Sequence, residues 1–479
     1  MRRVKLILPA LTEATDPYWR PIKYSLFPPL GLATLAAFLD PDDEAVADEH
    51  VAPLDIDDRP DLVLIQVYIT NAFRAYRIAD HYRARGSFVA LGGLHVTALP
   101  DEAARHADAI FLGPAEQTFP RFLGDLRAGR PLAVYRSTAD RTLHRVPPIR
   151  RDLIERRRYL VPNSIVVTRG CPHHCHFCYK DAFFEGGRSF YTQRVDEALA
   201  EIERLPGRHL YFLDDHLLGN RRFASALFDG MRGMNRLFQG AATVDSILSG
   251  DLIEQAAEAG LRSLFVGFET LSPANLAQSN KRQNLGRDYK AVTERLHRLG
   301  IMINGSFVFG MDGDDEDVFR RTVDCAIERG ITTATFHILT PYPGTALFAR
   351  MQEQRRIVTR HWPLYDTRHV VYRPARLEPE VLKQGYDWAY REFYRWSSIT
   401  RASLSHGTLK HQAKHFVYAA GWRKFEPLWD LVIRAKQLPQ MTPLLESVLA
   451  RATERHAVDA GPDPLTTSPR SSCSSIGVS

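Results

Sequence analysis

The chain has 479 residues, with 44% apolar and 25% charged side chains and a formal net charge of +6. This length allows two or three domains, and the composition is that of an ordinary globular protein. No apolar stretch approaches a membrane span, the N-terminus lacks the long apolar core of a signal peptide, and no aromatic-interleaved basic motif predicts nucleic-acid binding. The odd number of cysteines, five, favours a cytoplasmic protein over a disulfide framework.

The first 140 residues alternate short apolar runs with helical stretches. Alternation with short connections predicts a doubly wound parallel sheet over residues 1–140, which would bind ligands beyond the carboxyl ends of its strands. We expect strands at 4–8, 61–67, 87–92 and 109–113, helices at 29–39, 72–85 and 116–127, and a glycine-containing turn at 92–97.

A polar, basic and proline-bearing stretch over 141–163 predicts a linker, and a second alternation follows it. This alternation predicts a partial (β/α)6 barrel over 164–350, with its active site at the carboxyl ends of the strands. We expect barrel strands at 164–168, 209–213, 241–245, 262–268, 302–309 and 332–339, and helices at 194–204, 221–235, 251–259, 287–299 and 316–329.

The region 351–465 reads as mostly helical, and the serine-rich stretch 466–479 predicts a disordered tail. An aromatic-rich helix is expected at 379–396, and a further helix at 415–434. Aromatic residues at helical spacing usually belong to a core, so we expect the first of these helices to contribute to the core and to inter-domain packing. The alternative is a lid over a large apolar substrate.

Three cysteines follow the first barrel strand, in the spacing Cys171-x3-Cys175-x2-Cys178. Three thiolates on one loop can hold three corners of a cubane iron–sulfur cluster and leave the fourth iron open to a small molecule, whereas ferredoxin-type clusters have four cysteine ligands. Cys325 and Cys473 lie far along the chain, and we expect neither to bind the cluster. A zinc site is the alternative, because histidines 173, 174 and 176 lie between the cysteines. Structural zinc sites, however, usually pair two ligand couples, and the chain has no second couple.

The later barrel strands end in polar or glycine-bearing groups. Asp214 and Asp215 close the second strand, Asp245 closes the third, and Glu269, with Ser272 just after it, closes the fourth. One such group alone is ordinary turn chemistry, but a series of them behind a three-cysteine loop predicts a cofactor site.

The cysteine spacing, with an aromatic residue before the last cysteine, and the ordered strand ends resemble the radical S-adenosylmethionine (SAM) enzymes. The resemblance implies a [4Fe–4S] cluster whose open iron binds SAM, and an electron donor such as flavodoxin or ferredoxin. One electron from the cluster then cleaves SAM to a 5′-deoxyadenosyl radical. Lys281 or Arg282 would pair with the SAM carboxylate, although a solvated basic loop is the alternative. The implied SAM contacts are Phe177, Tyr179, Asp214, Asp215, Asp245, Glu269 and Ser272, with the two adjacent aspartates in the place of the family's glycine-glycine-glutamate element.

The N-terminal region resembles the cobalamin-binding domain that is fused to many radical SAM enzymes. The Asp-x-His-x-x-Gly element, whose histidine ligates cobalt elsewhere, is missing, so the resemblance implies cobalamin without a protein histidine on the metal. A relic domain that no longer binds the ligand is the alternative. The implied cobalamin contacts are Gly92, Gly93, His95, Thr97, Gly113 and Glu116.

This domain arrangement is similar to that of the hopanoid and bacteriochlorophyll methylases. It implies methylation of an unactivated carbon: the radical removes a hydrogen atom from the substrate, and the substrate then takes a methyl group from methylcobalamin. The substrate would be a lipid, a tetrapyrrole or a natural product, and no residue is assigned to it. The alternatives are a cobalamin-associated radical cyclase or rearrangement enzyme, and a non-catalytic iron–sulfur or zinc binding module.

Overall fold

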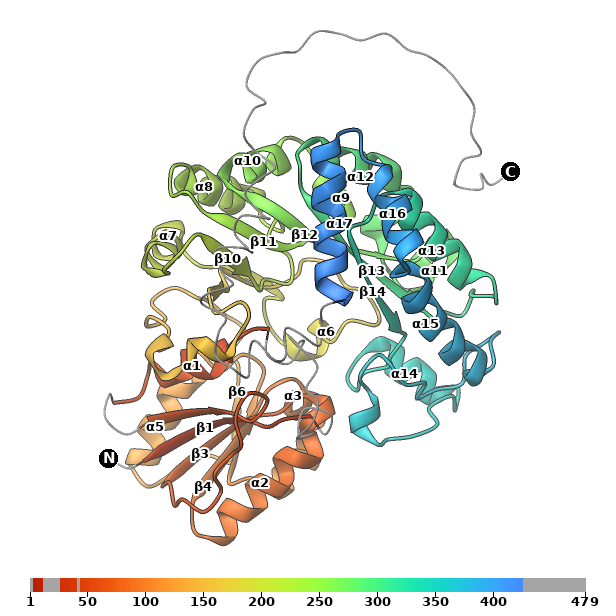
Figure 1. The fold of residues 1–479 in the computed structure, drawn as a ribbon. Coiled ribbons are helices and arrows are strands. Elements are labelled where there is room, and N and C mark those ends of the chain that lie inside the picture. The colour runs from red at the N-terminus through yellow and green to blue at the C-terminus, as the bar shows by residue number, and fades with distance from the viewer. Residues whose placement is uncertain (1–2, 12–25, 41–43, 425–479) are drawn as a thin grey trace.

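Two parallel β-sheets, one in each half of the chain, carry the fold (Figure 1). The computed structural model describes residues 3–11, 26–40 and 44–424. In Figure 1 the N-terminal sheet lies below the second sheet, and the short helix α6 (Lys180–Phe183) lies between them. No helix within these described ranges has the length and apolar character needed to cross a bilayer.

The N-terminal sheet has six parallel strands in the order β2-β1-β3-β4-β5-β6. In β3, Leu62 and Leu64 face the core that contains α1 and α5, whereas Val63 and Ile65 face α2. Both faces are therefore covered by helices, which confirms the doubly wound sheet. The elements are β1 (Val4–Leu8), α1 (Leu30–Ala36), β2 (Glu44–Asp48), β3 (Leu62–Gln66), α2 (Ala72–Ala84), β4 (Phe88–Gly92), α3 (Leu94–Ala98), α4 (Pro100–Ala103), β5 (Ala109–Leu112), α5 (Thr118–Arg127) and β6 (Val134–Arg136).

Three features of this half differ from the prediction. The strands β2 and β6 were not expected, and they form the two edges of the sheet. β2, with the sequence EAVAD, begins and ends with an acidic residue, and β6 has only three residues, so neither carries a clear apolar signal. The stretch 92–97, expected as a turn, contains most of the helix α3. The helix begins after Gly93, whose φ of +116° lets the chain turn sharply out of β4.

The second sheet also has six parallel strands, in the order β14-β13-β12-β11-β10-β7. Helices follow these strands on the outside, which confirms the partial barrel. The strands are β7 (Ser164–Ile165), β10 (His209–Phe212), β11 (Leu237–Ala242), β12 (Leu261–Glu269), β13 (Met302–Phe309) and β14 (Thr333–Ile338), and the helices are α7 (Val195–Arg204), α8 (Arg221–Met231), α9 (Val244–Leu248), α10 (Leu252–Ala259), α11 (Pro273–Gln278), α12 (Tyr289–Arg298), α13 (Val318–Glu328) and α14 (Ala346–Glu353).

The first barrel strand is broken, contrary to the single strand expected over 164–168. After β7 the chain enters β8 (Thr168–Gly170), which pairs antiparallel with β9 (Phe190–Thr192). The cysteine loop and α6 lie between these two short strands, so the hairpin holds both ends of the loop. The third strand begins at Leu237, before the expected residue 241.

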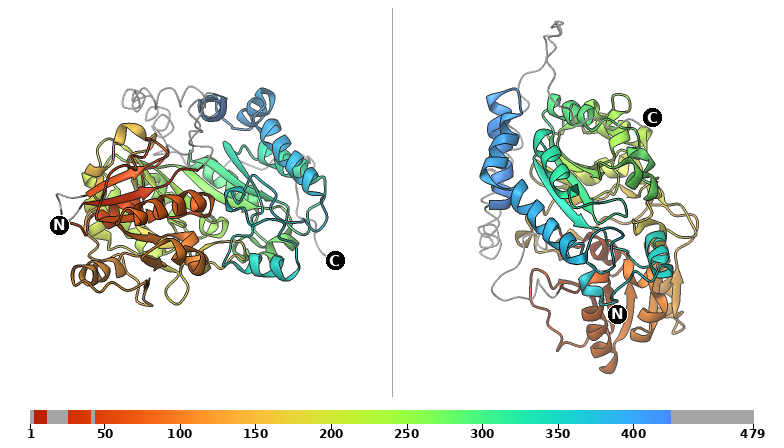
Figure 2. Two further views of the ribbon diagram at one scale, coloured as in Figure 1. Left: turned by 90° about the horizontal axis from the view of Figure 1, so that it is seen from below. Right: turned by 90° about the vertical axis from the view of Figure 1, so that its right-hand side faces the viewer.

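The C-terminal helices α15 (Pro379–Phe393), α16 (Trp396–Leu404) and α17 (Leu409–Lys424) run along one side of the barrel (Figure 2). On α15, the hydroxyl of Tyr390 lies 3.1 Å from both the N and the O of Phe336 in the edge strand β14. The hydroxyl of Tyr394 lies 3.1 Å from the N and 2.9 Å from the O of Ala334. The aromatic helix thus packs on the barrel, and its residues Tyr386, Phe393 and Tyr394 belong to the main core, which confirms the core part of the expectation. Residues 425–434 and 466–479 lie outside the described ranges.

Candidate functional site

The three motif cysteines lie on a tight loop between β8 and α6. Cys175 is buried, and Cys171 and Cys178 are half-buried. The amide of Cys178 donates to the carbonyl of Cys175 at 3.0 Å, and the amide of Cys171 donates to Ser189 at 3.2 Å. Gly170 has a φ of +74°, and a Cβ there would lie 2.0 Å from the carbonyl oxygen of Ser189. Only glycine therefore fits where the loop leaves β8.

The arrangement of this loop fits a cubane cluster better than a single ion. In the part of the chain that the structure describes, no three histidine, cysteine or acidic side chains converge as the ligands of one metal ion would. Cluster cysteines each bind a different iron, so their sulfur atoms surround a cluster and lie farther apart than the ligands of a single ion. The intervening histidines have other contacts: the ring of His174 lies 3.0 Å from Asp181, the ring of His176 lies 3.1 Å from the carbonyl of Gln278, and the ring of His173 stacks on His216.

Burial raises the pKa of Cys171 to about 11 and that of Cys178 to about 12. Thiols in such surroundings are inert at neutral pH unless a metal displaces their protons. Burial also raises the pKa of Cys175, which Lys281 and a hydrogen bond from Gln283 act to lower. The loop is therefore suited to metal ligation rather than to thiol chemistry.

A buried ion pair lies beside the loop. The Nζ of Lys281 lies 2.6 Å from Glu269, and Ser306 lies 3.5 Å from the other oxygen of this carboxylate. Glu269 ends β12 at a bulge and has a φ of +64°, a strained conformation for a residue with a side chain. Burial acts to lower the pKa of Lys281, but the charge and hydrogen bond of Glu269, together with the neighbouring Cys175, raise it above the ordinary value. Lys281 therefore keeps its positive charge next to Cys175.

A second polar pair lies on the other side of the loop. The hydroxyl of Tyr179 donates to Asp215 at 3.0 Å. Asp245 accepts from Thr243, which also lies 3.2 Å from the ring of His216. The structure therefore places the expected residues Tyr179, Asp215 and Glu269 beside the cysteines, each with a polar partner. Asp245 lies near His173 of the same loop and near His216.

The other expected SAM contacts have local structural partners. Asp214 accepts from the backbone amides of Val167, at 3.1 Å, and Thr168, and burial raises its pKa to about 7. Ser272 caps α11, with its hydroxyl accepting from Asn275 at 3.4 Å. Phe177 packs against the main core.

A cavity of about 150 Å³ opens at the carboxyl ends of β3, β4 and β5 in the N-terminal sheet. At Gly93, a Cβ would lie 2.7 Å from the carbonyl oxygen of Val67, and Gly113, with a φ of +78°, lies close to Ser137 and Phe183. The cavity is far smaller than a whole cobalamin, so it could hold only part of that ligand. The glycines at its edge are required by the protein's own packing, because a Cβ on Gly93 or Gly113 would meet neighbouring protein atoms. Its lining includes the expected residues Gly92, Gly93, Gly113 and Glu116, with Leu32, Leu35, Leu64, Phe111 and Phe119 as an apolar wall.

His95 and Thr97 do not line this cavity. The His95 side chain is fully buried, and its Nε2 lies 3.0 Å from Glu102, which also accepts from Tyr76 and Trp362, both at 3.1 Å. Thr97 accepts from the amide of Gly113 and donates to the carbonyl of Gly93, both at 2.9 Å. These two residues support the strand ends from behind.

Arg169 links the two halves, and sequence reasoning missed it. Its guanidinium lies 2.8 Å from Glu116 and lines the cavity of the N-terminal sheet. It also precedes Cys171 by two residues. The only signal in the sequence is an arginine next to the glycine-cysteine pair, and its partner lies 53 residues earlier.

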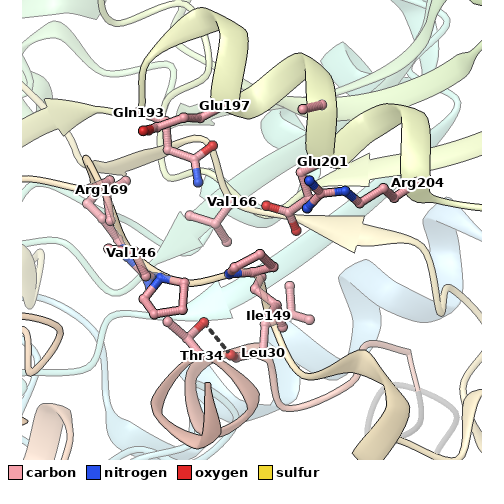
Figure 3. Close-up of a pocket in the computed structure, with 14 residues that line it drawn as sticks. Leu30, Thr34, Val146, Ile149, Val166, Arg169, Gln193, Glu197, Glu201 and Arg204 are labelled. Carbon is pink, nitrogen blue, oxygen red and sulfur yellow. Dashed lines mark hydrogen bonds between the residues drawn. The ribbon is translucent and has the colours of Figure 1, made fainter. Parts of the chain in front are cut away.

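A larger cavity of about 210 Å³ lies at the junction of the two halves, between α1, residues 143–149 and α7 (Figure 3). Arg169 lines this cavity as well, but none of the three motif cysteines does. We therefore assign the site to the smaller cavity and the cysteine loop.

Comparisons with known proteins agree with this geometry. The chain matches the Radical SAM superfamily over residues 165–326 and the B12 binding domain over residues 24–123. It is 31% identical to the bacteriochlorophyllide d C-12(1)-methyltransferase of Chlorobaculum tepidum, over 71% of this chain and 76% of that protein. It is 26% identical to the hopanoid C-2 methylase of Rhodopseudomonas palustris, over 74% of this chain and 71% of that protein.

Two solved structures share the fold. The cobalamin-dependent SAM radical enzyme OxsB, with aqua-cobalamin and SAM bound, has a TM-score of 0.64 at 14% identity, over 94% of this chain and 76% of that one. The radical SAM methyltransferase TsrM of Kitasatospora setae has a TM-score of 0.58 at 17% identity, over 74% and 76%.

The two matched domains imply a [4Fe–4S] cluster, SAM and cobalamin as cofactors. The chain therefore belongs to the radical SAM enzymes that carry a B12-binding domain, the family of the bacteriochlorophyllide and hopanoid methylases.

Proposed function

We propose that this cobalamin-dependent radical SAM methyltransferase transfers a methyl group to an unactivated carbon of a large apolar ring compound, and that tetrapyrroles are the first substrate class to test. The bacteriochlorophyllide d C-12(1)- and C-8(2)-methyltransferases, at 31% and 28% identity, support this class. The proposed electron donor is a flavodoxin or ferredoxin of the cytoplasm.

The position of Arg169 carries the proposal. This residue lines the cobalamin cavity, pairs with Glu116 of the N-terminal sheet and stands two residues before the first cysteine. A cobalamin in the cavity would therefore lie next to the cluster loop. Such proximity is what a methyl transfer between the two cofactor sites and a common substrate needs.

The residues around the loop have separable proposed roles. When bound, the cluster and SAM supply the radical, and cobalamin carries the methyl group. Cys171, Cys175 and Cys178 would hold the cluster, and the charges of Glu269 and Lys281 would face the amino acid end of SAM. Tyr179 and Asp215 would contact the rest of SAM, with Phe177 and Asp245 as further contacts.

In the N-terminal sheet, Gly92, Gly93, Gly113 and Glu116 would contact cobalamin. His95 would not ligate cobalt, because its ring is fully buried and its Nε2 is bonded to Glu102. We also propose the division into a cobalamin domain (1–140), a linker (141–163), a barrel (164–350), a mostly helical region (351–465) and a tail (466–479), of which residues 425–479 lie outside the described ranges.

Anaerobic reconstitution with iron, sulfide and hydroxocobalamin tests the function. With SAM, a reductant and a bacteriochlorophyllide, we expect 5′-deoxyadenosine and a product heavier by one methylene, which gains deuterium from methyl-labelled SAM. Cys175→Ala should lose the cluster, and Cys325→Ala should retain it.

5′-Deoxyadenosine with a product of unchanged carbon count would favour a cyclase or rearrangement enzyme. Loss of cobalamin on desalting would favour a relic domain, and a nitrogen-ligated cobalt spectrum that disappears in His95→Ala would contradict the assignment of His95.

A further inference from the structure

The last residue of α11 and the segment after it lie along the cysteine loop and are bonded to it on both sides of Cys175. We call residues 278–284 the bracing segment. The amide of His176 donates to the carbonyl of Ser279 at 3.0 Å, and the side-chain amide of Asn280 donates to the carbonyl of His174 at 2.7 Å. These bonds fix the backbone of the loop before and after the central cysteine.

Within the bracing segment, Gln283 reaches the sulfur itself. Its Nε2 lies 3.4 Å from the Sγ of Cys175, and both residues are buried, with 7% and 8% of their surfaces exposed. Its Oε1 has no hydrogen-bond partner among the described residues. An amide buried in this way costs about 1–3 kcal/mol for its unpaired group. If this position served packing alone, an apolar side chain would fill it at a lower cost in free energy than a buried amide. We therefore take the contact with sulfur as the reason for an amide here.

A hydrogen bond to a cluster thiolate has a defined electronic effect. Reduction adds one negative charge to the cluster, and part of this charge resides on the sulfur ligands. An N–H donor stabilises that charge more in the reduced form than in the oxidised form. Hydrogen bonds to the sulfurs and neighbouring net charge are established determinants of cluster potentials.

We propose that Gln283 is a positioning residue that raises the reduction potential of the cluster through its hydrogen bond to Cys175. The cluster gains one electron from a low-potential one-electron donor, so Gln283 would set how much of the cluster is reduced and available to cleave SAM. This inference rests on the proposed role of Cys175 as a cluster ligand. If that role is wrong, the Cys175→Ala variant described above will keep its full iron content, which distinguishes failure of the proposed function from failure of this inference.

The test compares Gln283→Leu with a matched control in the same segment. Gln278→Leu makes the same chemical change, but the Gln278 side chain donates to Asp312 at 2.7 Å and not to a sulfur. The full-length proteins are reconstituted anaerobically without SAM, assayed for iron and sulfide, and titrated against redox mediators, with the reduced cluster followed by electron paramagnetic resonance.

We expect full iron content in both variants. At a fixed solution potential, the ratio of reduced to oxidised cluster should fall at least threefold in Gln283→Leu and stay unchanged in Gln278→Leu; a tenfold fall would correspond to 59 mV for one electron. Gln283→Glu keeps the shape, removes the donor when ionised and adds a negative charge, so its ratio should fall further.

Equal potentials in wild type and in both Gln283 variants, with full iron content, would overturn the proposal. Loss of iron in both Gln283 variants would also overturn it, because the residue would then hold the cluster in place rather than tune its potential. An equal shift in Gln278→Leu would assign the effect to the segment as a whole and not to the hydrogen bond.

Discussion

Glu269 is a buried carboxylate held in a strained backbone conformation. Its partners are Lys281 at 2.6 Å and Ser306 at 3.5 Å, and its φ is +64°. Strain of this kind persists where surrounding contacts over-determine it, and it clusters at ligand sites.

We expect Glu269→Gln to leave Lys281 buried without its counter-charge, lowering the free energy of unfolding by about 3 kcal/mol. Iron content should stay unchanged, whereas the rate of SAM cleavage should fall, because a charge that we propose to face the cofactor is lost. Glu254→Gln, which removes the partner of Arg295 on the barrel exterior, is the matched control. Lost stability with a normal cleavage rate would show that the pair is structural only.

The raised pKa of Asp214 predicts that the stability of the folded protein depends on pH. Burial raises its pKa from 3.8 to about 7, although the amides of Val167 and Thr168 act to lower it. In the unfolded chain Asp214 releases its proton near pH 4, so between about pH 4 and 7 the folded state holds one more proton than the unfolded state. The contribution of this group is complete below pH 4 and is lost as the pH rises through 7.

Urea unfolding of the apoprotein should therefore show stability falling by about 1–3 kcal/mol between pH 5 and 7, given 1.36 kcal/mol per pKa unit. Asp214→Asn keeps an acceptor for both amides and should flatten this profile. A variant profile as steep as that of wild type would assign the dependence to another group.

The short helix α3 is the element that connects the cobalamin cavity to the cluster side. It starts after Gly93 of the cavity, and a Cβ on Gly344 would meet both Ala98 of α3, at 3.4 Å, and Ala182 of α6, at 2.8 Å. From behind, α3 is held by His95, which shares Glu102 with Trp362 of the C-terminal region. Glu102 thus joins α2, α3 and the C-terminal region, through its bonds to Tyr76, His95 and Trp362.

We expect Trp362→Phe to retain the ring packing and lose the bond to Glu102, a charged acceptor, which is worth about 1.5–3 kcal/mol. Iron content should be normal, whereas cobalamin should dissociate faster on desalting, because α3 is less firmly held. Trp396→Phe, at an exposed tryptophan of α16, is the control. Unchanged cobalamin retention, together with lowered thermal stability, would limit the contact to a structural role.

The elements that could be predicted are those with strong apolar periodicity. The apolar runs of β1, β3 and β4 and of the central barrel strands mark them, because strands buried on both faces leave a continuous signal. The edge strands β2 and β6 have no such signal, and the break between β7 and β8 follows from pairing with β9, some 20 residues later.

The site residues show a similar limit. The spacing of the cysteines marks their loop, but the partners of Asp214 and His95 cannot be seen in the sequence, because polar strand ends look alike whether they bind a ligand or the backbone. Ser272 is different: serine followed by proline is a local sign of a helix start, and in the structure it caps α11. Whether it also contacts SAM stays a prediction.

In the molecule as a whole, Arg169 of the β8–β9 hairpin pairs with Glu116 of the N-terminal half, and the open edge of the barrel at β14 is covered by α15. Tyr390 and Tyr394 satisfy the outward backbone groups of Phe336 and Ala334 there.

Replacing both tyrosines with phenylalanine leaves these backbone groups buried and unpaired, which we expect to lower the free energy of unfolding by about 2–4 kcal/mol. Tyr386→Phe, one turn earlier on α15, should cost much less. Equal losses in urea unfolding would show that ring packing, and not hydrogen bonding, covers the edge.

These two phenols take the place of a neighbouring strand. An uncovered strand of this kind pairs readily with any other extended chain, which is the usual starting point of aggregation and strand exchange. A fragment of the protein that ends before residue 379 would keep every cofactor-binding residue proposed above. It would, however, expose the unpaired edge of β14 to other chains. Attempts to produce a minimal catalytic core from this protein should therefore preserve α15, even though no residue of that helix is assigned to the chemistry.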